Sequence, residues 1–307
     1  MASLEISRPD ARRAALGGLI DYAGLFPPTE LGMKDAVAGY RAARTGPEAW
    51  MVDRFLCPVG RLEELAGVLM GTMGPGEPAW RISAIAAGTD LDAEVATIEA
   101  FDAEMGGAAS VQLVETRVPP EDLAVWAARA VEMLDRMVFF EVPWQADIAT
   151  ALDALAAARD GTRRALGAKM RAGGLSADDF PPPEAVAAFI AACRDRSLPM
   201  KATAGLHHPV RHVDPETGFT RHGFLNLLAA AALASRGDDI TTLAEVVGDD
   251  DPRAFTLDGS GLRWRDQKVS ATDLQSARRD LFVAYGSCSF DEPVEDLTAL
   301  GVLPVGS

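Results

Sequence analysis

Short apolar runs of β-forming residues alternate along the chain with longer, alanine-rich runs that have an amphipathic pattern. Seven of the short runs predict strands, whose starts lie about 30 residues apart, the length of one βα unit. These strands are expected at 19–23, 50–57, 80–86, 109–116, 137–142, 165–171 and 199–204. Helices are expected between and after them, at 31–44, 61–72, 90–105, 120–135, 146–159, 182–195 and 219–236.

This even succession, without a break in composition, predicts one α/β domain over residues 1–307, a (β/α)8 barrel of the TIM type. An open doubly wound sheet is the alternative, but no Gly-x-Gly-x-x-Gly follows the first strand. Residues 240–270 are expected to form an insertion with a helix at 241–247 and a hairpin that turns at 258–261.

The eighth barrel unit is expected after this insertion. Strand eight is predicted at 281–286, and the last helix at 291–300. The alternative continues the preceding helix through 285 and makes 254–258 the eighth strand.

Composition and charge narrow the class of partner. The net charge of −16 disfavours binding to nucleic acid and to anionic membranes. No run of 18 apolar residues occurs, so the alanine-rich stretch at 224–234 is expected to be a buried helix. The first residues lack the apolar core of a secretory signal. The odd number of cysteines, three, suits a reducing cytoplasm and excludes a disulfide framework.

Two of the four lysines lie at equivalent places on neighbouring predicted strands. Lys169 and Arg171 share one face of strand six, and Lys201 and Thr203 share one face of strand seven, while Ala and Met occupy the alternate positions. Barrel active sites lie at the carboxyl ends of the strands, so both lysines are expected to point into the mouth of the barrel. A neighbouring cation lowers the pKa of a lysine and makes it a nucleophile for a Schiff base. Alternatively, each lysine is a solvated charge or the partner of a carboxylate.

The segments VFFEV, GAKMRAGG and MKATAGLHHP together resemble the strand ends of class I aldolase barrels, especially the deoxyribose-phosphate aldolase family. That family carries a Schiff-base lysine on strand six, followed by Thr-x-x-Gly, and a second lysine on strand seven, followed by x-x-Gly-Gly. Lys169 and Lys201 match these positions, whereas Ala204 stands at the first glycine and Met170 and Arg171 replace the threonine-containing stretch. The resemblance implies lyase chemistry through an imine. The whole chain also resembles an uncharacterised family of bacterial (β/α)8 proteins, with the landmarks LIDYAGLFPP, KATAGLHHP and GSCSFDEPVEDL.

Carboxylates at other strand ends are candidates for proton transfer. Strand one carries Asp21 and strand five carries Glu141; each is either a general acid and base or an ion-pair partner of the cations. The sequence does not show which side chains point into the barrel on two other strands. These are Glu115 and Arg117 on strand four, and Asp53 and Arg54 on strand two.

All four histidines lie between 207 and 222. Their spacing matches no metal-binding pattern, so no metal site and no cofactor are expected. His207 is a candidate acid or base, and His208 is expected to line the mouth of the barrel.

Loop 286–289 precedes the last predicted helix. If strand eight ends here, its backbone N–H groups, with Ser287 and Cys288, lie where many barrels hold phosphate. Alternatively, Ser289 and Glu292 form a capping box. A nucleophilic Cys288 requires a nearby base, which His207 could supply.

Together these patterns predict a barrel enzyme that acts on a small anionic carbonyl compound. Lys169 or Lys201 is the expected nucleophile, Asp21 or Glu141 moves protons, and Arg171 holds the anionic end. One alternative is a non-covalent isomerase, decarboxylase or phosphoribosyltransferase that uses the same basic pocket. The other is a barrel that binds a small anion or a partner without turnover. The sequence leaves open whether the chain forms a homo-oligomer.

Overall fold

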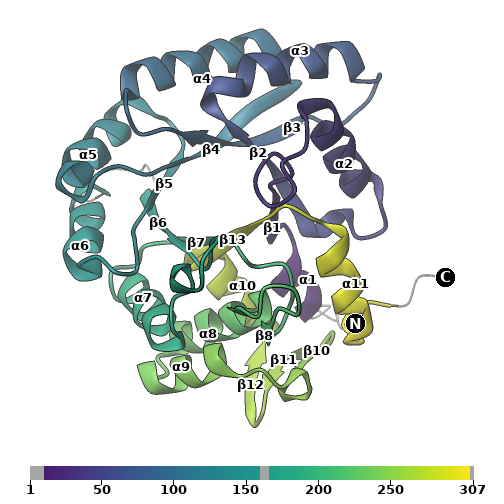
Figure 1. Ribbon diagram of the computed structural model, residues 1–307, viewed down its shortest axis with the longest axis vertical. Coiled ribbons are helices and arrows are strands. Elements are labelled where there is room, and N and C mark those ends of the chain that lie inside the picture. Colours follow the sequence, from purple (N-terminus) through teal and green to yellow (C-terminus); the bar gives the residue numbers. More distant parts are fainter. Residues whose placement is uncertain (1–9, 160–165, 305–307) are drawn as a thin grey trace, which may run out of the picture.

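Eight parallel strands form a closed barrel in the computed structural model, which describes residues 10–159 and 166–304 (Figure 1). The order around the barrel is β1-β13-β7-β6-β5-β4-β3-β2. The strands are β1 (Ile20–Tyr22), β2 (Val52–Pro58), β3 (Trp80–Ala86), β4 (Ala109–Thr116), β5 (Met137–Glu141), β6 (Leu166–Arg171), β7 (Met200–Thr203) and β13 (Phe282–Ser287). The predicted TIM-type barrel is therefore confirmed.

Helices surround the barrel on its outer face (Figure 1). They are α2 (Met33–Thr45), α3 (Leu62–Thr72), α4 (Leu91–Met105), α5 (Leu123–Met133), α6 (Ile148–Arg159), α7 (Pro183–Asp195), α8 (Phe224–Arg236), α10 (Ala271–Asp280) and α11 (Asp291–Ala299). Helix α4 shows how local sequence sets the bounds. The Asp90 side chain accepts the Ala93 N–H at its start, and Gly106 ends it with a φ of 52°.

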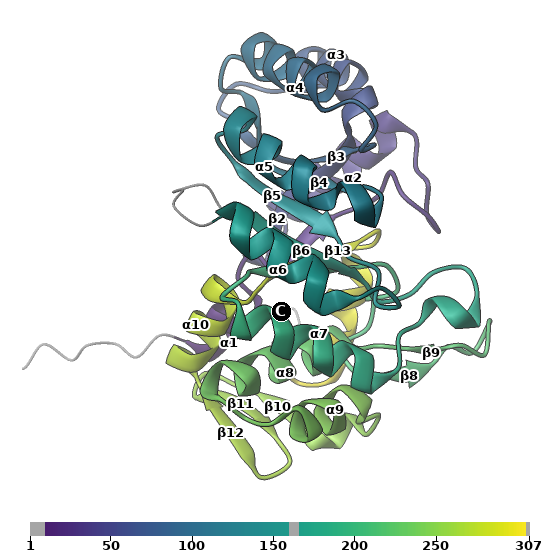
Figure 2. The ribbon, with the colours of Figure 1, turned by 90° about the vertical axis from the view of Figure 1, so that its left-hand side faces the viewer.

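Short elements complete the chain. Helix α1 (Ala11–Leu16), which the sequence pattern did not predict, lies toward the amino ends of the strands (Figure 2). Single 3-10 turns occur at η1 (Ala49–Met51), η2 (Val59–Arg61), η3 (Pro120–Asp122), η4 (Ala177–Asp179) and η5 (Pro252–Ala254).

Buried apolar side chains form two layers because successive strand residues point to opposite faces. A continuous cluster fills the space between strands and helices, and includes the packed rings of Tyr40, Phe55 and Trp80. Leu56, Leu113 and Phe139 are also buried but lie outside that cluster, on the strand face that lines the barrel.

Helix α8 is buried along its whole apolar stretch, from Phe224 to Ala234, as the alanine-rich sequence predicted. The predicted start of this helix at 219 was wrong. Thr220–Arg221 form strand β9, which pairs with β8 (His212–Val213) in a small hairpin, and Gly223 is the residue before the helix. Figure 2 shows this hairpin projecting at the opposite end of the barrel from α1.

The predicted insertion contains α9 (Ile240–Gly248) and three short antiparallel strands, β10 (Phe255–Leu257), β11 (Gly261–Trp264) and β12 (Gln267–Ser270). This sheet lies outside the barrel, near α8 and α9 (Figures 1 and 2). The alternative that made 254–258 the eighth strand was wrong, because β10 pairs with β11 and not with a barrel strand.

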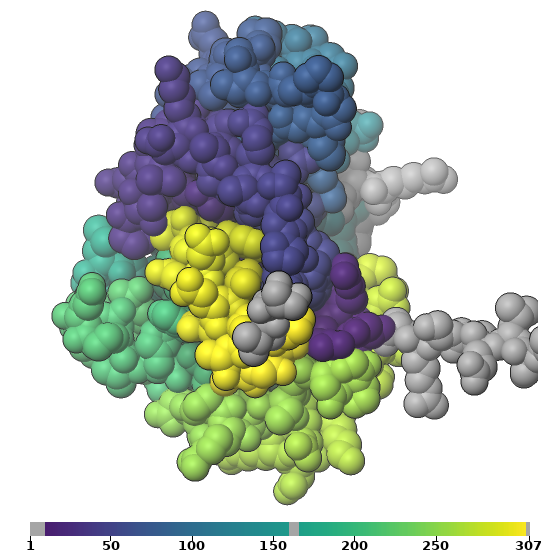
Figure 3. Space-filling model, turned by 90° about the vertical axis from the view of Figure 1, so that its right-hand side faces the viewer, coloured from purple at the N-terminus to yellow at the C-terminus, as the bar shows by residue number. Residues whose placement is uncertain are grey.

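Strand β13 closes the barrel between β1 and β7. Figure 3 shows α11, in yellow, packed beside the first elements of the chain, in purple. Three segments far apart in sequence therefore meet at this side of the barrel: the ends of β1, β7 and β13.

Candidate functional site

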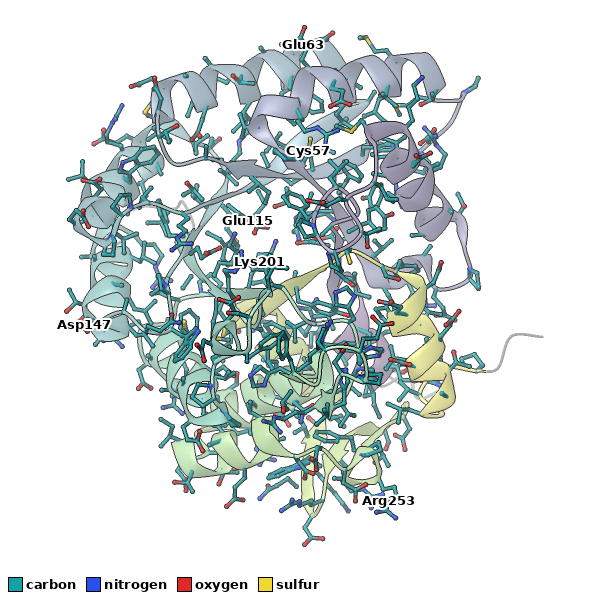
Figure 4. All side chains as sticks on the ribbon, viewed as in Figure 1. Cys57, Glu63, Glu115, Asp147, Lys201 and Arg253 are labelled. Atoms are coloured by element: carbon teal, nitrogen blue, oxygen red, sulfur yellow. The ribbon has the colours of Figure 1, made fainter. Side chains whose placement is uncertain are left out.

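A buried lysine lies at the centre of the barrel. Lys201 is 1% exposed, its Nζ lies 2.5 Å from Asp21 Oδ2, and it donates a further hydrogen bond to Glu115 Oε1. The Ser83 hydroxyl donates to the same Glu115 oxygen, at 2.8 Å. Figure 4 shows the Lys201 and Glu115 side chains pointing toward one another inside the barrel.

The second lysine lies on the other side of Glu115. Lys169 is 6% exposed, and its Nζ lies 3.2 Å from Glu115 Oε2 and 3.3 Å from Glu141 Oε2. The two lysines thus bind the two oxygens of one carboxylate. They stand side by side because β6 and β7 pair with Lys169 opposite Lys201, and β5 places Glu141 opposite Lys169.

Arg54 extends this row of charges on the other side. Its backbone N–H donates to Asp21 Oδ1 at 3.1 Å, and its guanidinium lies 3.4 Å from the same oxygen. From Arg54 to Glu141 the row alternates cation and carboxylate, three of each. Burying such groups is tolerable because every charge has a partner of opposite sign.

These contacts fix the protonation of the two central groups. Burial opposes the charge of Lys201, but the Asp21 and Glu115 carboxylates outweigh it, so the pKa of Lys201 is raised. Burial likewise opposes the charge of Glu115, but Lys201 and Lys169 lower its pKa to about 2. The expectation that neighbouring cations lower the pKa was wrong for Lys201, because a carboxylate stands between the two lysines.

A pocket of about 170 Å³ opens beside Lys169, at the carboxyl ends of β4, β5 and β6. It is lined by Arg117, Glu141, Pro143, Trp144, Gln145, Arg171, Gly173 and Asp179. Glu141 belongs to both regions, since one of its oxygens faces Lys169 and the other lies 3.7 Å from Arg117. A small molecule in this pocket would meet two arginines and the carboxylate next to the Lys169 amine.

The structure brings four of the predicted residues together: Asp21, Glu141, Lys169 and Lys201. Arg171, predicted to hold the anionic end of a substrate, lines the pocket. Thr203 lies half-buried at the end of β7. The chain then turns through Ala204 and Gly205, whose φ values are 64° and 73°. Position 204, where the aldolase pattern has glycine, thus adopts a conformation that favours glycine.

His207 and Cys288 form a second cluster. His207 Nδ1 lies 2.8 Å from Glu292 Oε2, and its Nε2 lies 3.7 Å from the Cys288 sulfur. The capping-box interpretation holds only in part. Ser289 Oγ accepts the Glu292 N–H at 3.3 Å, but the Glu292 side chain binds His207 instead.

The remaining predicted residues have structural partners. His208 Nδ1 lies 2.5 Å from Asp296 Oδ2, and the Ser287 hydroxyl donates to the Ser289 carbonyl. Buried His222 is hydrogen-bonded to the Pro181 carbonyl at 2.7 Å. Within residues 10–159 and 166–304, no three histidine, cysteine or acidic side chains are grouped as a metal site would require.

Glu115 is the main site residue that the sequence pattern left unassigned. Strand β4 contains an irregularity: Ile82 pairs with Val111 and Ser83 with Leu113, so Gln112 has no partner. Val111 therefore packs against the helices, whereas Leu113 and Glu115 face the barrel. Strict alternation would place Val111, Leu113 and Glu115 on the same face of the strand. The sequence alone did not show whether that face points into the barrel or toward the helices.

The fold and the site define a TIM-type α/β barrel with a buried pair of lysines bridged by carboxylates next to a small, arginine-lined pocket. No known family model matches the sequence, and the sequence matches no curated protein. No helix in the described part of the chain is long and apolar enough to cross a membrane.

Proposed function

We propose that this protein is an enzyme of the lyase type that acts on a small anionic carbonyl compound through an imine on Lys169. The observation that carries the proposal is the position of the Lys169 amine. It lies between Glu115, which binds both lysines, and Glu141, which lines the open pocket. Lys201 lies deeper and is held by two carboxylates, so it is the less accessible of the two amines.

The two lysines have different tasks in this proposal. Lys201 remains protonated and fixes Glu115 in its ionised form. Lys169 gives a proton to Glu141, 3.3 Å away, and becomes the nucleophile. Arg117 and Arg171 bind the carboxylate or phosphate of the substrate. Glu141 and Asp179 line the same pocket, so the two guanidinium groups act on the anion locally and the pocket has no net positive charge.

The reaction then follows from the chemistry of imines. The Lys169 nitrogen adds to the carbonyl carbon, Glu141 returns its proton to the oxygen, which leaves as water, and a protonated imine remains beside the ionised Glu141. Glu141 removes the proton of the β-hydroxyl group, the bond between the α and β carbons breaks, and its electron pair moves into the imine to give an enamine. Protonation of the enamine and hydrolysis release the second product and free Lys169.

A non-covalent mechanism is the second candidate, and one observation favours it. Both lysine amines are engaged by carboxylates, so they are placed to act as fixed cations that stabilise an enolate. An isomerase or a decarboxylase would use the pocket in this way. Binding of a small anion without turnover needs only Arg117 and Arg171.

Hydrogen exchange separates these mechanisms. An enamine-forming enzyme exchanges the hydrogens on the α carbon of its substrate with solvent, which ¹H NMR in D₂O detects. We expect exchange with pyruvate, acetaldehyde or dihydroxyacetone phosphate as the probe. Lys169→Arg keeps the charge but cannot form an imine, so exchange should fall at least about a hundredfold, the loss of one essential group.

The exposed lysines on helix α2 and strand β12 give the matched controls. Lys34→Arg and Lys268→Arg should exchange at the wild-type rate. Exchange that persists in Lys169→Arg would support the non-covalent mechanism and rule out the imine. Binding of these probes without any exchange would point to the non-catalytic alternative.

A further inference from the structure

A second group of reactive side chains lies at the same end of the barrel and takes no part in the lysine chemistry. It is assembled from the loops that follow β1, β7 and β13, together with the first turn of α11. Its members are Thr29, His207, Cys288 and Glu292. Figure 3 shows the segment of β13 and α11 between the elements that supply the other members.

The geometry is that of an activated nucleophile. Glu292 Oε2 lies 2.8 Å from His207 Nδ1, and because a carboxylate only accepts, Nδ1 carries the hydrogen. This bond holds the imidazole beside Cys288, whose sulfur lies 3.7 Å from Nε2 and 3.9 Å from Nδ1. A carboxylate that orients an imidazole, which in turn contacts a nucleophile, is the arrangement that several unrelated enzymes share.

Thr29 belongs to the same cluster and comes from a different loop, the one that follows β1. Its side chain and its backbone both lower the pKa of the Cys288 thiol. Thr29 therefore favours the negative thiolate over the neutral thiol. Cys288 is 7% exposed, whereas Cys57 and Cys193 are fully buried.

The pKa shifts of Cys288 and His207 also favour a thiolate beside a protonated imidazole. Burial would raise the pKa of the Cys288 thiol, but the hydrogen bonds from His207 and Thr29 lower it below its ordinary value. Burial would lower the pKa of His207, but Cys288 and Glu292 raise it. Tyr22 is a further titratable group on this side of the barrel, and its pKa is raised by burial and by the charges of Cys288 and Asp291. The other two cysteines differ, because burial raises the pKa of Cys57 to about 12 and that of Cys193 even further.

We propose that Cys288 is the nucleophile of a second reactive centre that binds small aldehydes as reversible thiohemiacetals, with His207 as the acid and Glu292 as the positioning residue. The thiolate sulfur adds to the aldehyde carbon, and the π electron pair moves to the oxygen. That oxygen takes the proton from His207 Nε2. The imidazole is then neutral and keeps its Nδ1–H on Glu292. The step needs no oxidant and reverses when the proton returns.

Competition with an alkylating reagent tests this centre. Native protein is treated with iodoacetamide at pH 6.5, with and without acetaldehyde, and each cysteine is quantified by peptide mass spectrometry. We expect Cys288 to react at least tenfold faster than glutathione, while Cys57 and Cys193 stay unlabelled and serve as internal controls. Acetaldehyde should slow the labelling of Cys288 in a saturable way that dilution reverses.

Variants separate this proposal from the lysine chemistry. The protection by acetaldehyde should persist in Lys169→Arg, where no imine forms. His207→Gln should slow alkylation of Cys288 at pH 6.5 at least tenfold and move the midpoint of its pH profile upward. Glu292→Gln should give a smaller change in the same direction. Circular dichroism checks that each variant is folded.

Either of two kinds of result, one from alkylation and one from protection, would overturn the proposal. One is alkylation of Cys288 at the rate of glutathione, with the same pH profile in wild type and both variants. The other is an unchanged rate in saturating acetaldehyde, or protection that disappears in Lys169→Arg. The last result would assign the aldehyde to Lys169 alone.

Discussion

A missing side chain makes room for the lysine pair. Gly167 stands opposite Phe139 on the neighbouring strand, and a Cβ at this position would overlap the Phe139 ring and lie 2.7 Å from the Pro199 carbonyl oxygen. The Phe139 ring therefore occupies the space that a side chain at position 167 would need. The Lys201 Nζ stands over it, 5.8 Å from the ring centroid, in a favourable cation–π contact.

Gly167→Ala tests this packing. The added methyl group must displace the Phe139 ring or the backbone, so we expect a loss of about 2 kcal/mol in the free energy of unfolding, as for other overpacked cores. Gly67→Ala is the matched control, since Gly67 lies in helix α3 with nothing within 4 Å of its Cβ position. Alanine should stabilise that helix by about 0.5–1 kcal/mol. Urea unfolding measures the free energy of unfolding of both variants. Equal effects at the two sites would contradict the close packing of Phe139 against Gly167.

At this scale the sequence predicted the two lysines together with Asp21 and Glu141, but not the carboxylate of Glu115 between the lysines. The alternation of small and charged residues on β6 and β7 was enough to turn Lys169 and Lys201 inward. It could not place Glu115, because the unpaired Gln112 shifts the phase of β4. The protonation of Lys201 depends on that carboxylate, and so it could not be predicted either.

One side chain joins three elements beside the barrel. Asn226, the chain's single asparagine, is fully buried in α8. Its Oδ1 accepts the Arg211 N–H at 2.9 Å, and its Nδ2 donates to the carbonyls of Val246 and Asp249 at 2.7 and 2.8 Å. It thereby fixes the loop after β7 and the end of α9 to the same helix.

Asn226→Ala should cost about 3 kcal/mol of folding free energy, because three buried backbone groups lose their partner. Ser235→Ala, in the same helix, should change stability by less than about 0.5 kcal/mol, since Ser235 bonds only to a carbonyl within α8. Denaturant titration of both variants gives the comparison. A loss below about 1 kcal/mol in Asn226→Ala would show that these three hydrogen bonds contribute little to stability.

The elements themselves were largely predictable. Even spacing and two-residue alternation located all eight barrel strands, because the same unit recurs and each strand must bury one face against a helix. Helix α1 and the hairpin of β8 and β9 were not predicted. They are short, and the hairpin is held by side-chain bonds of Asp214 to its own turn rather than by an apolar pattern.

The stability of the whole barrel depends on pH through its charged centre. The pKa of Glu115 is lowered to about 2, so its stabilising effect is complete above the ordinary glutamate range and disappears as the pH falls through 2. The pKa of Lys201 is raised, so its contribution is complete below the ordinary lysine pKa and disappears as the pH rises through the folded-state value. The centre is therefore stabilising between these limits.

Between pH 4.5 and 2 the wild-type protein should lose about 3 kcal/mol through Glu115 alone. Glu115→Gln removes this titration, so its unfolding free energy should fall less steeply over the same range. Glu63→Gln, on the outer face of α3, should keep the wild-type slope (Figure 4). Urea unfolding at each pH measures the slopes; identical slopes in wild type and Glu115→Gln would exclude an ionised Glu115 at the centre.

The measurement that bears most directly on the proposed chemistry is borohydride trapping. The protein is reduced with sodium borohydride in the presence of pyruvate or acetaldehyde, and the adduct is mapped by intact-mass and peptide spectrometry. We predict one reduced imine per chain, on Lys169, absent from Lys169→Arg and unaffected by Lys34→Arg. An adduct on Lys201 would contradict the roles given to the two lysines. Equal labelling of all four lysines, or no adduct with either probe, would contradict an imine mechanism altogether.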